Sequence, residues 1–555
     1  MSSAPVKWIK LSGINERIHS RKVRIMKRRD FFKTSAALGI AGTAGQGCSS
    51  FGQVSPEPKF NIHPFVRQHP EAVFVHFTSV GEKTDAADIC RAGQLLSCEL
   101  IVRSPDGWSA GSTVNIKPNW TSAGPVDGKP VVEKLGINTD PNFVEGWVAA
   151  MRELGPVKFF IRESCCPTQW EPMGWRAMCT RAGIDLRELS TIDVWKLTEG
   201  KDVIFRKVPN GVVFNTVAYQ APMNEPGSFL VNIAKLKAHG MGITAAVKNL
   251  QGITCRRFHQ FCMSHDQVLK SCEPPYHKYF QKDFALHIEK LHGQHVRDGI
   301  PRWDCIIGVD TGIRMEQWVQ RTLDSVGCIP TALNMVEGIY SQDGNGFGLG
   351  PHEPIGPDKV TSRDYMSNMV IFGKDMFRVD IIAHWLAGHE PGNFGLFHIA
   401  RERGMLDVMD PHDIPIYDWK DGKAAPIKLE SLTRTPLVTL YLRGKEEPEY
   451  HLCNEPFNYS AFRNIKKKSS AAPSIRYLGP DRDSRAVFDL TLPEHGETAA
   501  DILDARGRIV ERLLSGELEA GSHHALWRAF AEPGVYTARV RGQGWETMGR
   551  LIIQG

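Results

Sequence analysis

Short apolar runs alternate with helical patterns between residues 60 and 430. After Pro141, apolar residues from Phe143 to Leu154 recur at helical spacing and stop at Gly155. Strands that alternate with helices are typical of a parallel sheet covered on its faces. We therefore predict an α/β domain over residues 61–430, a mostly parallel sheet with helices on both faces. Its predicted strands include 114–116, 157–161, 229–231, 305–309, 333–336 and 369–372.

The pattern changes near the C-terminus. Residues 479–555 contain short runs in which apolar and polar positions alternate, separated by turns such as the one at Gly507. This pattern predicts a small all-β sandwich. The less regular residues 431–478, which include a lysine run, are predicted to form a linker, as are residues 49–60.

The N-terminal residues are typical of an export signal. A basic segment, 27–33, precedes a weakly apolar stretch rich in Ala and Gly, as in signal peptides. Arg28 and Arg29 followed by Asp-Phe-Phe-Lys match a twin-arginine signal. We expect residues 1–48 to direct the chain through the twin-arginine machinery to the periplasm or cell envelope, with Met26 as the true start. Acylation of Cys48, which would tether the protein to a membrane, is left open.

Composition limits the function classes. The chain has 555 residues, 42% hydrophobic and 23% charged, which excludes wholesale disorder and a polytopic membrane protein. The formal net charge is +5, but the first 48 residues hold ten basic and only two acidic side chains. The remainder is slightly acidic, so a nucleic-acid partner is not expected.

The densest group of candidate residues lies between 232 and 252. Lys235, Lys237 and His239 end a predicted strand, and a helix is expected from near Gly242 to Gly252. Such a helix would place Thr244 and Lys248 on one face. Cations beside a helix N-terminus favour a carboxylate or phosphate, whereas the competing interpretation is a solvated basic loop.

Further polar residues follow other predicted strands, where ligands of α/β sheets bind. We predict catalytic roles for one set: Glu163, His239, Lys248 and Asp343. Substrate binding is predicted for a second set: Lys117, Asn119, Lys235, Lys237, Thr244 and Asn249. Asp380 was open to two interpretations, a site acid or the cap of a following helix.

Cysteine and histidine concentrate in residues 253–295. The candidate metal ligands there are Cys255, His259, Cys262 and His265. Their spacing is not that of a zinc finger, and interleaved aromatics equally favour a packed lid. Cys165 and Cys166, directly after the Glu163 strand, are either site thiols or inert buried thiols.

The 232–252 segment resembles the signature of the domain of unknown function 362, a family of uncharacterised bacterial and archaeal proteins. Residues 114–119, 159–164, 335–346 and 375–388 agree with it in order. Members often occur with iron–sulfur modules, so the resemblance implies a metal ion or iron–sulfur cluster as cofactor. The four-cysteine insert that some members carry is missing from this sequence.

Residues 504–510, 520–527 and 533–536 resemble Ig-like modules of flagellar hook-capping proteins and C-terminal secretion tails, which serve as scaffolds. Two functions are therefore expected. The first is an exported, cofactor- or metal-dependent enzyme acting on a small anionic molecule. The alternative is a non-catalytic cell-envelope binding protein whose Ig-like module mediates association.

Overall fold

The structure is a computed structural model. The residues that it describes are 59–121, 125–126, 129–130, 136–156, 158–240, 242–255, 258, 268–269, 272–302, 312–354, 360–441, 449–460, 473–480, 486–493, 496–518, 521–527, 534–543 and 545–553. The predicted export signal, the start at Met26, Cys48 and the strand predicted at 305–309 lie outside these residues.

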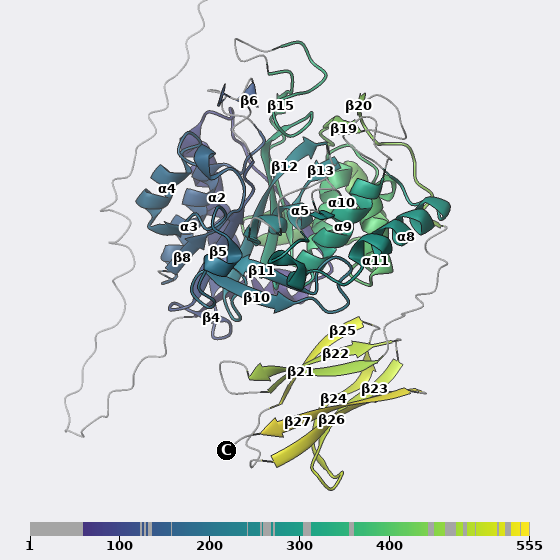
Figure 1. The fold of residues 1–555 in the computed structure, drawn as a ribbon. Coiled ribbons are helices and arrows are strands. Elements are labelled where there is room, and N and C mark those ends of the chain that lie inside the picture. The colour runs from purple at the N-terminus through teal and green to yellow at the C-terminus, as the bar shows by residue number, and fades with distance from the viewer. Residues whose placement is uncertain are drawn as a thin grey trace, which may run out of the picture. The chain divides into compact units, whose positions relative to one another are not determined.

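One large sheet organises the α/β domain (Figure 1). Neighbouring strands from β14 through β12, β5 and β8 to β9 are parallel, as predicted. The strand predicted at 369–372 forms, but it runs antiparallel to both neighbours. The order is β18 (Lys423–Pro426), β17 (Ile416–Lys420), β2 (Val73–Phe77), β16 (Met369–Gly373), β14 (Leu333–Gln342), β12 (Phe229–His239), β5 (Thr113–Pro118), β8 (Lys158–Ile161) and β9 (Ile184–Leu186), with β13 (Gly242–Thr244) beside β12 and β15 (Asp364–Tyr365) beside β14.

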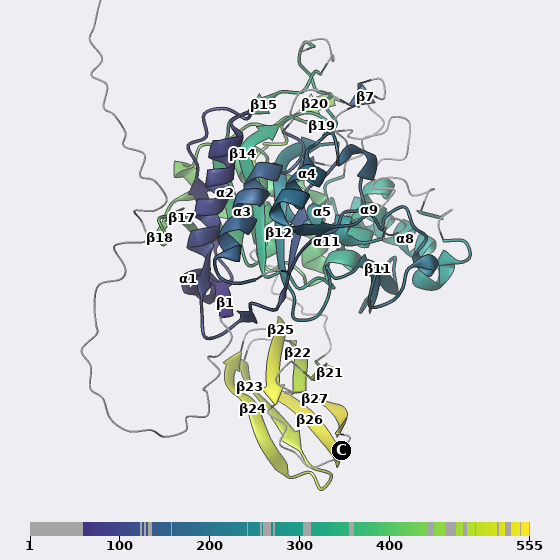
Figure 2. The same cartoon turned by 90° about the vertical axis from the view of Figure 1, so that its left-hand side faces the viewer.

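Helices cover both faces of this sheet (Figures 1 and 2). Each face has its own apolar core because successive strand residues point to opposite sides. One core takes residues from α2 (Ala86–Leu100), α3 (Pro141–Arg152) and α4 (Trp175–Ala182). The other takes residues from α5 (Ala246–Leu250), α8 (Phe284–Arg297), α9 (Ile313–Val326), α10 (Met376–Leu386) and α11 (Gly395–Glu402).

The strand order reverses between β5 and β12. From β5 the chain crosses through α3 to β8, on one side of β5. From β12 it crosses through α5 and α9, on the opposite face, to β14 on the other side. The two connections leave the sheet in opposite directions, so the carboxyl ends of both strands form a topological switch point, where ligands of open α/β sheets bind. This position in the fold is where we examine the candidate residues.

Smaller elements complete the domain. Leu437 and Cys453 are buried in its core, so packing continues beyond the boundary predicted at residue 430. These elements are β1 (Lys59–Ile62), α1 (Pro64–Gln68), β3 (Ile101–Arg103), β4 (Trp108–Ser109), β6 (Pro125–Val126), β7 (Lys129–Pro130), β10 (Val203–Lys207), β11 (Thr216–Gln220), β19 (Thr439–Tyr441), β20 (Glu449–His451) and short 3-10 turns.

The C-terminal residues form antiparallel sheets. One sheet has the order β21 (Ser474–Pro480), β22 (Ala486–Leu492), β25 (Gly521–Trp527); the other is β24 (Ile509–Leu518), β23 (Gly496–Leu503), β26 (Gly534–Gly542), β27 (Trp545–Ile553). Phe488, Ile502 and Trp527 share an apolar core of their own. Among all described residues, no helix is long and apolar enough to cross a membrane.

Candidate functional site

Polar side chains occupy the carboxyl ends of β5, β8 and β12. Lys117 is the next-to-last residue of β5, and Glu163 lies two residues beyond β8. Lys235, Lys237 and His239 lie among the last five residues of β12. Leu236 and Ala238, which alternate with the β12 cations, pack in the α5–α9 core. The three cations therefore share the opposite face of the strand.

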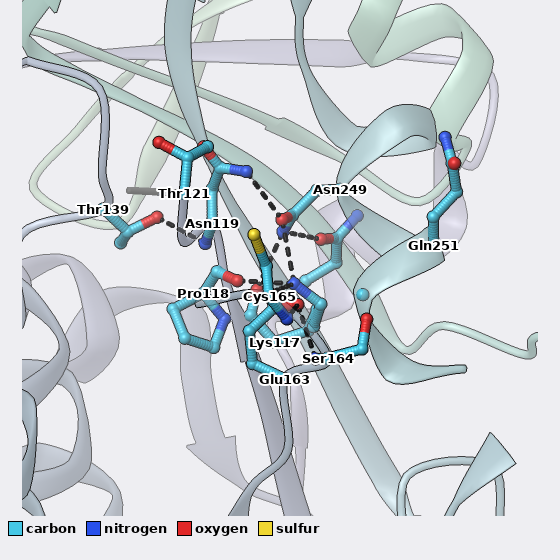
Figure 3. A network of polar contacts seen from close by, with 12 residues as sticks. Lys117, Pro118, Asn119, Thr121, Thr139, Glu163, Ser164, Cys165, Asn249 and Gln251 are labelled. Carbon is cyan, nitrogen blue, oxygen red and sulfur yellow. Dashed lines mark hydrogen bonds and ion pairs between the residues drawn. The ribbon is translucent and has the colours of Figure 1, made fainter. Parts of the chain in front are cut away.

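A buried network joins the ends of β5 and β8 to α5 (Figure 3). Lys117 Nζ lies 2.5 Å from Glu163 Oε2 and donates to Asn249 Oδ1 at 3.0 Å. Asn249 Nδ2 donates in turn to Asn232 Oδ1 at 2.7 Å, and Asn119 donates to Asn249 Oδ1. The structure thus brings together the predicted residues Lys117, Asn119, Glu163 and Asn249.

Glu163 is held from several sides. Its Oε1 accepts the backbone N–H of Ser164 at 2.8 Å and of Cys165 at 3.1 Å. Burial raises the pKa of Glu163, and Lys117 and the backbone donors oppose that shift. Gly252 lies against this carboxylate, and a Cβ there would lie 2.2 Å from Oε1. The close approach explains why this position holds glycine.

Lys235 forms a buried ion pair with Glu337. Its Nζ lies 2.9 Å and 2.8 Å from the two oxygens of Glu337, and both side chains are 0% exposed. The same ammonium lies 3.5 Å from the centre of the Tyr340 ring. Tyr340 donates to Asp140, whose backbone N–H is directed at Glu337. Because Glu337 already satisfies Lys235, this lysine has a partner other than the anion that we predicted for it.

Lys237, two residues along the same strand, has a different environment. Its side chain is 0% exposed, and Nζ has no hydrogen-bond partner among the described residues. Burial, and then the charge of Lys248, hold the pKa of Lys237 well below its usual range. Burial, Lys248 and Lys237 likewise lower the pKa of His239, whose Nδ1 also lacks a partner there. Two basic side chains of this corner, Lys237 and His239, therefore each have a buried nitrogen without a hydrogen-bond partner among the described residues.

The helix predicted from Gly242 starts later. Residues Gly242–Thr244 form β13, which turns back along β12, and α5 begins only at Ala246. The prediction that Thr244 and Lys248 share a helix face is therefore wrong. Asp380 from α10 accepts the N–H groups of Ala246 and Val247 at 2.6 and 3.1 Å. These N-terminal amides therefore already have a side-chain acceptor.

Asp380 also corrects a second expectation. It was considered as a cap for a helix following it, but α10 begins at Met376 and is capped by Asp375. Asp380 lies inside α10 and instead caps α5, which is far from it in sequence. Its buried carboxylate fixes the position of the helix that carries Lys248 and Asn249.

Asp343 lies just beyond the end of β14 and has a full set of partners. Its Oδ2 is 2.6 Å from His352 Nε2 and accepts from the Tyr365 hydroxyl at 3.1 Å. Its Oδ1 accepts the N–H of Arg363 at 2.7 Å. These contacts hold the loop after β14 against β15, so Asp343 organises this edge of the sheet.

Cys165 and Cys166 lie in the turn after β8. Their sulfur atoms are 3.1 Å apart, and both side chains are half-buried. Cys166 adopts a left-handed backbone conformation, with φ of 45° and ψ of 51°, which is uncommon outside glycine and asparagine. Both thiols interact electrostatically with Lys237. The sequence had left open whether they are site thiols, and the structure places them beside the candidate site.

The predicted metal ligands are only partly described. Cys255 is buried, and burial raises its pKa to about 12, which disfavours the thiolate that metals bind. His259, Cys262 and His265 lie outside the described residues. His295 is buried between Glu316 and Glu402 at 2.8 and 2.7 Å. Within the described ranges, no group of three or more Cys, His, Asp and Glu side chains is placed to hold a metal.

The chain matches a known family over the region that holds these residues. Residues 114–384 match the family model described as Domain of unknown function (DUF362). The match supports membership of the DUF362 family. It runs from β5 through α10, and so includes the switch point and every residue of the Lys117 network. No curated protein matches the chain.

Two residues of the DUF362 region, Glu337 and Asn232, were not predicted as partners in the site, and a third, Asp380, caps another helix than the one predicted for it. Glu337 pairs with Lys235, Asn232 links Asn249 to Asn334, and Asp380 caps α5. Glu337 has a visible signal, because it is a lone charge within the apolar run from Met335 to Ile339. The role of Asp380 has no such signal, since its partner amides are more than 130 residues away.

Proposed function

We propose that the α/β domain is an enzyme that binds a small anionic substrate at the switch point beyond the carboxyl ends of β5 and β12. The observation that carries this proposal is the Lys237 amine, fully buried at a strand end with no hydrogen-bond partner among the described residues. A buried polar group without a partner is costly, and such groups are concentrated at functional sites. A carboxylate or phosphate is the ligand that would satisfy it.

The neighbours of Lys237 support an anion over a cation. Lys248 and His239 add positive charge when protonated, whereas the described carboxylates of Glu163 and Glu337 are already paired with Lys117 and Lys235. The chain therefore offers positive charge at this point and keeps its acids occupied. We propose that Lys237, Lys248 and His239 bind the anion. The Lys117–Glu163–Asn249 network then holds the neighbouring strand ends and α5 in place.

The family resemblance implies a metal or iron–sulfur cofactor, and the described residues of the site can be compared with the ligands that such a cofactor needs. Within the described residues the site supplies one carboxylate, Glu163, already bound to an ammonium, and two adjacent thiols. That donor set does not complete the coordination of a structural metal site, which usually takes four ligands. We therefore derive no chemical step through a metal.

The substitution Lys248→Ala is expected to abolish anion binding while leaving the melting profile unchanged. Lys248 is only half-buried, so its loss removes charge from the site at little cost in packing. Binding of inorganic phosphate is measured by titration calorimetry, with Lys420→Ala as the control, since Lys420 is exposed at the end of β17. Normal phosphate and carboxylate binding by Lys248→Ala would refute the site.

Anion binding is also expected to take up protons. Burial and the neighbouring positive charges hold the pKa values of Lys237 and His239 well below their usual range, which favours the neutral form of each. A bound anion favours their charged forms and raises both pKa values, so affinity should fall as the pH rises. Calorimetry in buffers of different ionisation enthalpy measures the proton uptake. Uptake that persists in Lys237→Met and His239→Gln variants would contradict this assignment.

The alternative proposal is a non-catalytic cell-envelope binding protein. The C-terminal sheets have an apolar core of their own, which favours this alternative. A module with its own core could mediate association with another component of the cell envelope. On either proposal, we infer from the twin-arginine pattern at Arg28 and Arg29 that the protein is exported to the periplasm or cell envelope. A protein truncated near Leu478 should still bind the anion but lose its localisation if the module mediates association. Normal localisation would count against the alternative.

A further inference from the structure

We propose that Cys165 and Cys166 form a redox-active dithiol that reduces small-molecule disulfides and is itself converted to a vicinal disulfide. The two sulfur atoms already lie 3.1 Å apart, and the turn that carries them is fixed on both sides. Glu163 Oε1 accepts the N–H of Cys165, and the Trp170 indole donates to the Cys165 carbonyl at 3.1 Å. This function lies beyond the proposed anion binding and does not require it.

The exposure of the pair suits a reaction with a small molecule. Both residues are half-buried, which suits reaction with a disulfide of glutathione size better than with a folded protein. By contrast Cys179 and Cys255 are buried, and burial raises the pKa of each to about 12. Thiols of that kind remain protonated and unreactive.

Lys237 provides the proton acceptor. A thiol attacks a disulfide only as its thiolate, so a base must first take the proton. The Lys237 amine is buried, interacts electrostatically with both thiols, and has no other described hydrogen-bond partner. Burial and the charge of Lys248 lower the pKa of Lys237, which favours the neutral amine that can receive the proton. The ammonium that results then stabilises the thiolate by charge.

The reaction balances in two steps. One thiolate attacks a sulfur of the small disulfide, forms a mixed disulfide and releases the first thiolate of the reagent. The second cysteine, after losing its proton, attacks the mixed disulfide, forms the Cys165–Cys166 bond and releases the second. Two electrons pass from the protein sulfurs to the reagent, the two cysteine protons end on the two released thiols, and Lys237 returns to its neutral amine.

The product should be easily reduced again. Adjacent Cα atoms lie about 3.8 Å apart, closer than the range of roughly 4.4–6.8 Å found for ordinary disulfides. A bond between neighbouring residues is therefore strained, and strained disulfides are the labile ones that take part in catalysis or regulation. The left-handed Cys166 backbone shows that this turn already departs from relaxed geometry.

The test is a redox titration of the full chain in mixtures of reduced and oxidised glutathione, followed by alkylation of free thiols. Trypsin releases residues 163–176 as one peptide that contains Cys165 and Cys166 and no other cysteine. We expect this peptide to change in one step from doubly alkylated to unalkylated and internally bonded. Either single variant, Cys165→Ser or Cys166→Ser, should instead accumulate a stable mixed disulfide with glutathione.

Cys98 is the internal control, because it is exposed and has no adjacent cysteine. Its peptide should carry either the alkyl group or glutathione throughout. Double alkylation of the 163–176 peptide across the whole titration would overturn the proposal. So would accumulation of glutathione on the pair in the parent protein without internal bond formation.

The role of Lys237 has its own readout. In Lys237→Met the rate of exchange at neutral pH should fall about tenfold, and the pH–rate profile should move up toward that of an ordinary thiol. Lys420→Ala should leave both unchanged. An unaltered pH–rate profile in folded Lys237→Met would refute the role of Lys237 as proton acceptor, whereas the proposal that the two cysteines form a redox-active dithiol would stand. Loss of phosphate binding with normal thiol exchange, as expected for Lys248→Ala, separates this proposal from the anion site.

Discussion

Replacing Lys235 by methionine should destabilise the α/β domain by about 3–5 kcal/mol, whereas the same change at Lys237 should cost less than about 1 kcal/mol. Both lysines are 0% exposed and lie on the same face of β12. Lys235→Met leaves the Glu337 carboxylate buried without its cation. Lys237→Met removes an amine that has no hydrogen-bond partner among the described residues.

Urea unfolding followed by tryptophan fluorescence measures both free energies, since several tryptophans are buried in the two cores. The double variant Lys235→Met with Glu337→Leu should recover part of the stability, because no unpaired charge remains. Phosphate binding should be lost in Lys237→Met despite its stability. Equal destabilisation by the two single variants would show that Lys237 has a structural partner and would weaken the proposed site.

Gly252→Ala is the second substitution with a large expected effect. A Cβ at this position would lie 2.2 Å and 2.6 Å from the two oxygens of Glu163. A glutamate side chain can usually move aside, but this one is held by Lys117 and by two backbone N–H groups. Displacing it breaks a buried ion pair, so we expect a loss of about 3 kcal/mol.

The control is Gly293→Ala, at a helical glycine of α8 whose nearest neighbour to a new Cβ is a flexible arginine 3.6 Å away. That substitution should be neutral or slightly stabilising. Adding Glu163→Ala to Gly252→Ala should cost less than the sum of the two single changes, because both act on one contact. Thermal melting of the four proteins measures this coupling, and strict additivity would contradict it.

The local pattern of this chain determined its elements and its class. The strands predicted at 114–116, 157–161, 229–231, 333–336 and 369–372 all form, and so do the helix after Pro141 and the C-terminal strands. The reason is that burial periodicity and the turn residues that end an element are local properties. The candidates Lys117, Glu163 and Asn249 were also found in this way, because each follows or flanks a strand end.

Tertiary structure decided what those residues do. The sequence could not distinguish Lys235 from Lys237, since their roles depend on Glu337, about 100 residues away on the neighbouring strand. Nor could it show that the α5 N-terminus is occupied by Asp380, or that β16 runs antiparallel. Strand order placed the switch point between β5 and β12 and brought the thiols after β8 toward Lys237. These contacts join segments that are far apart in the sequence, so the local pattern of residues does not predict them.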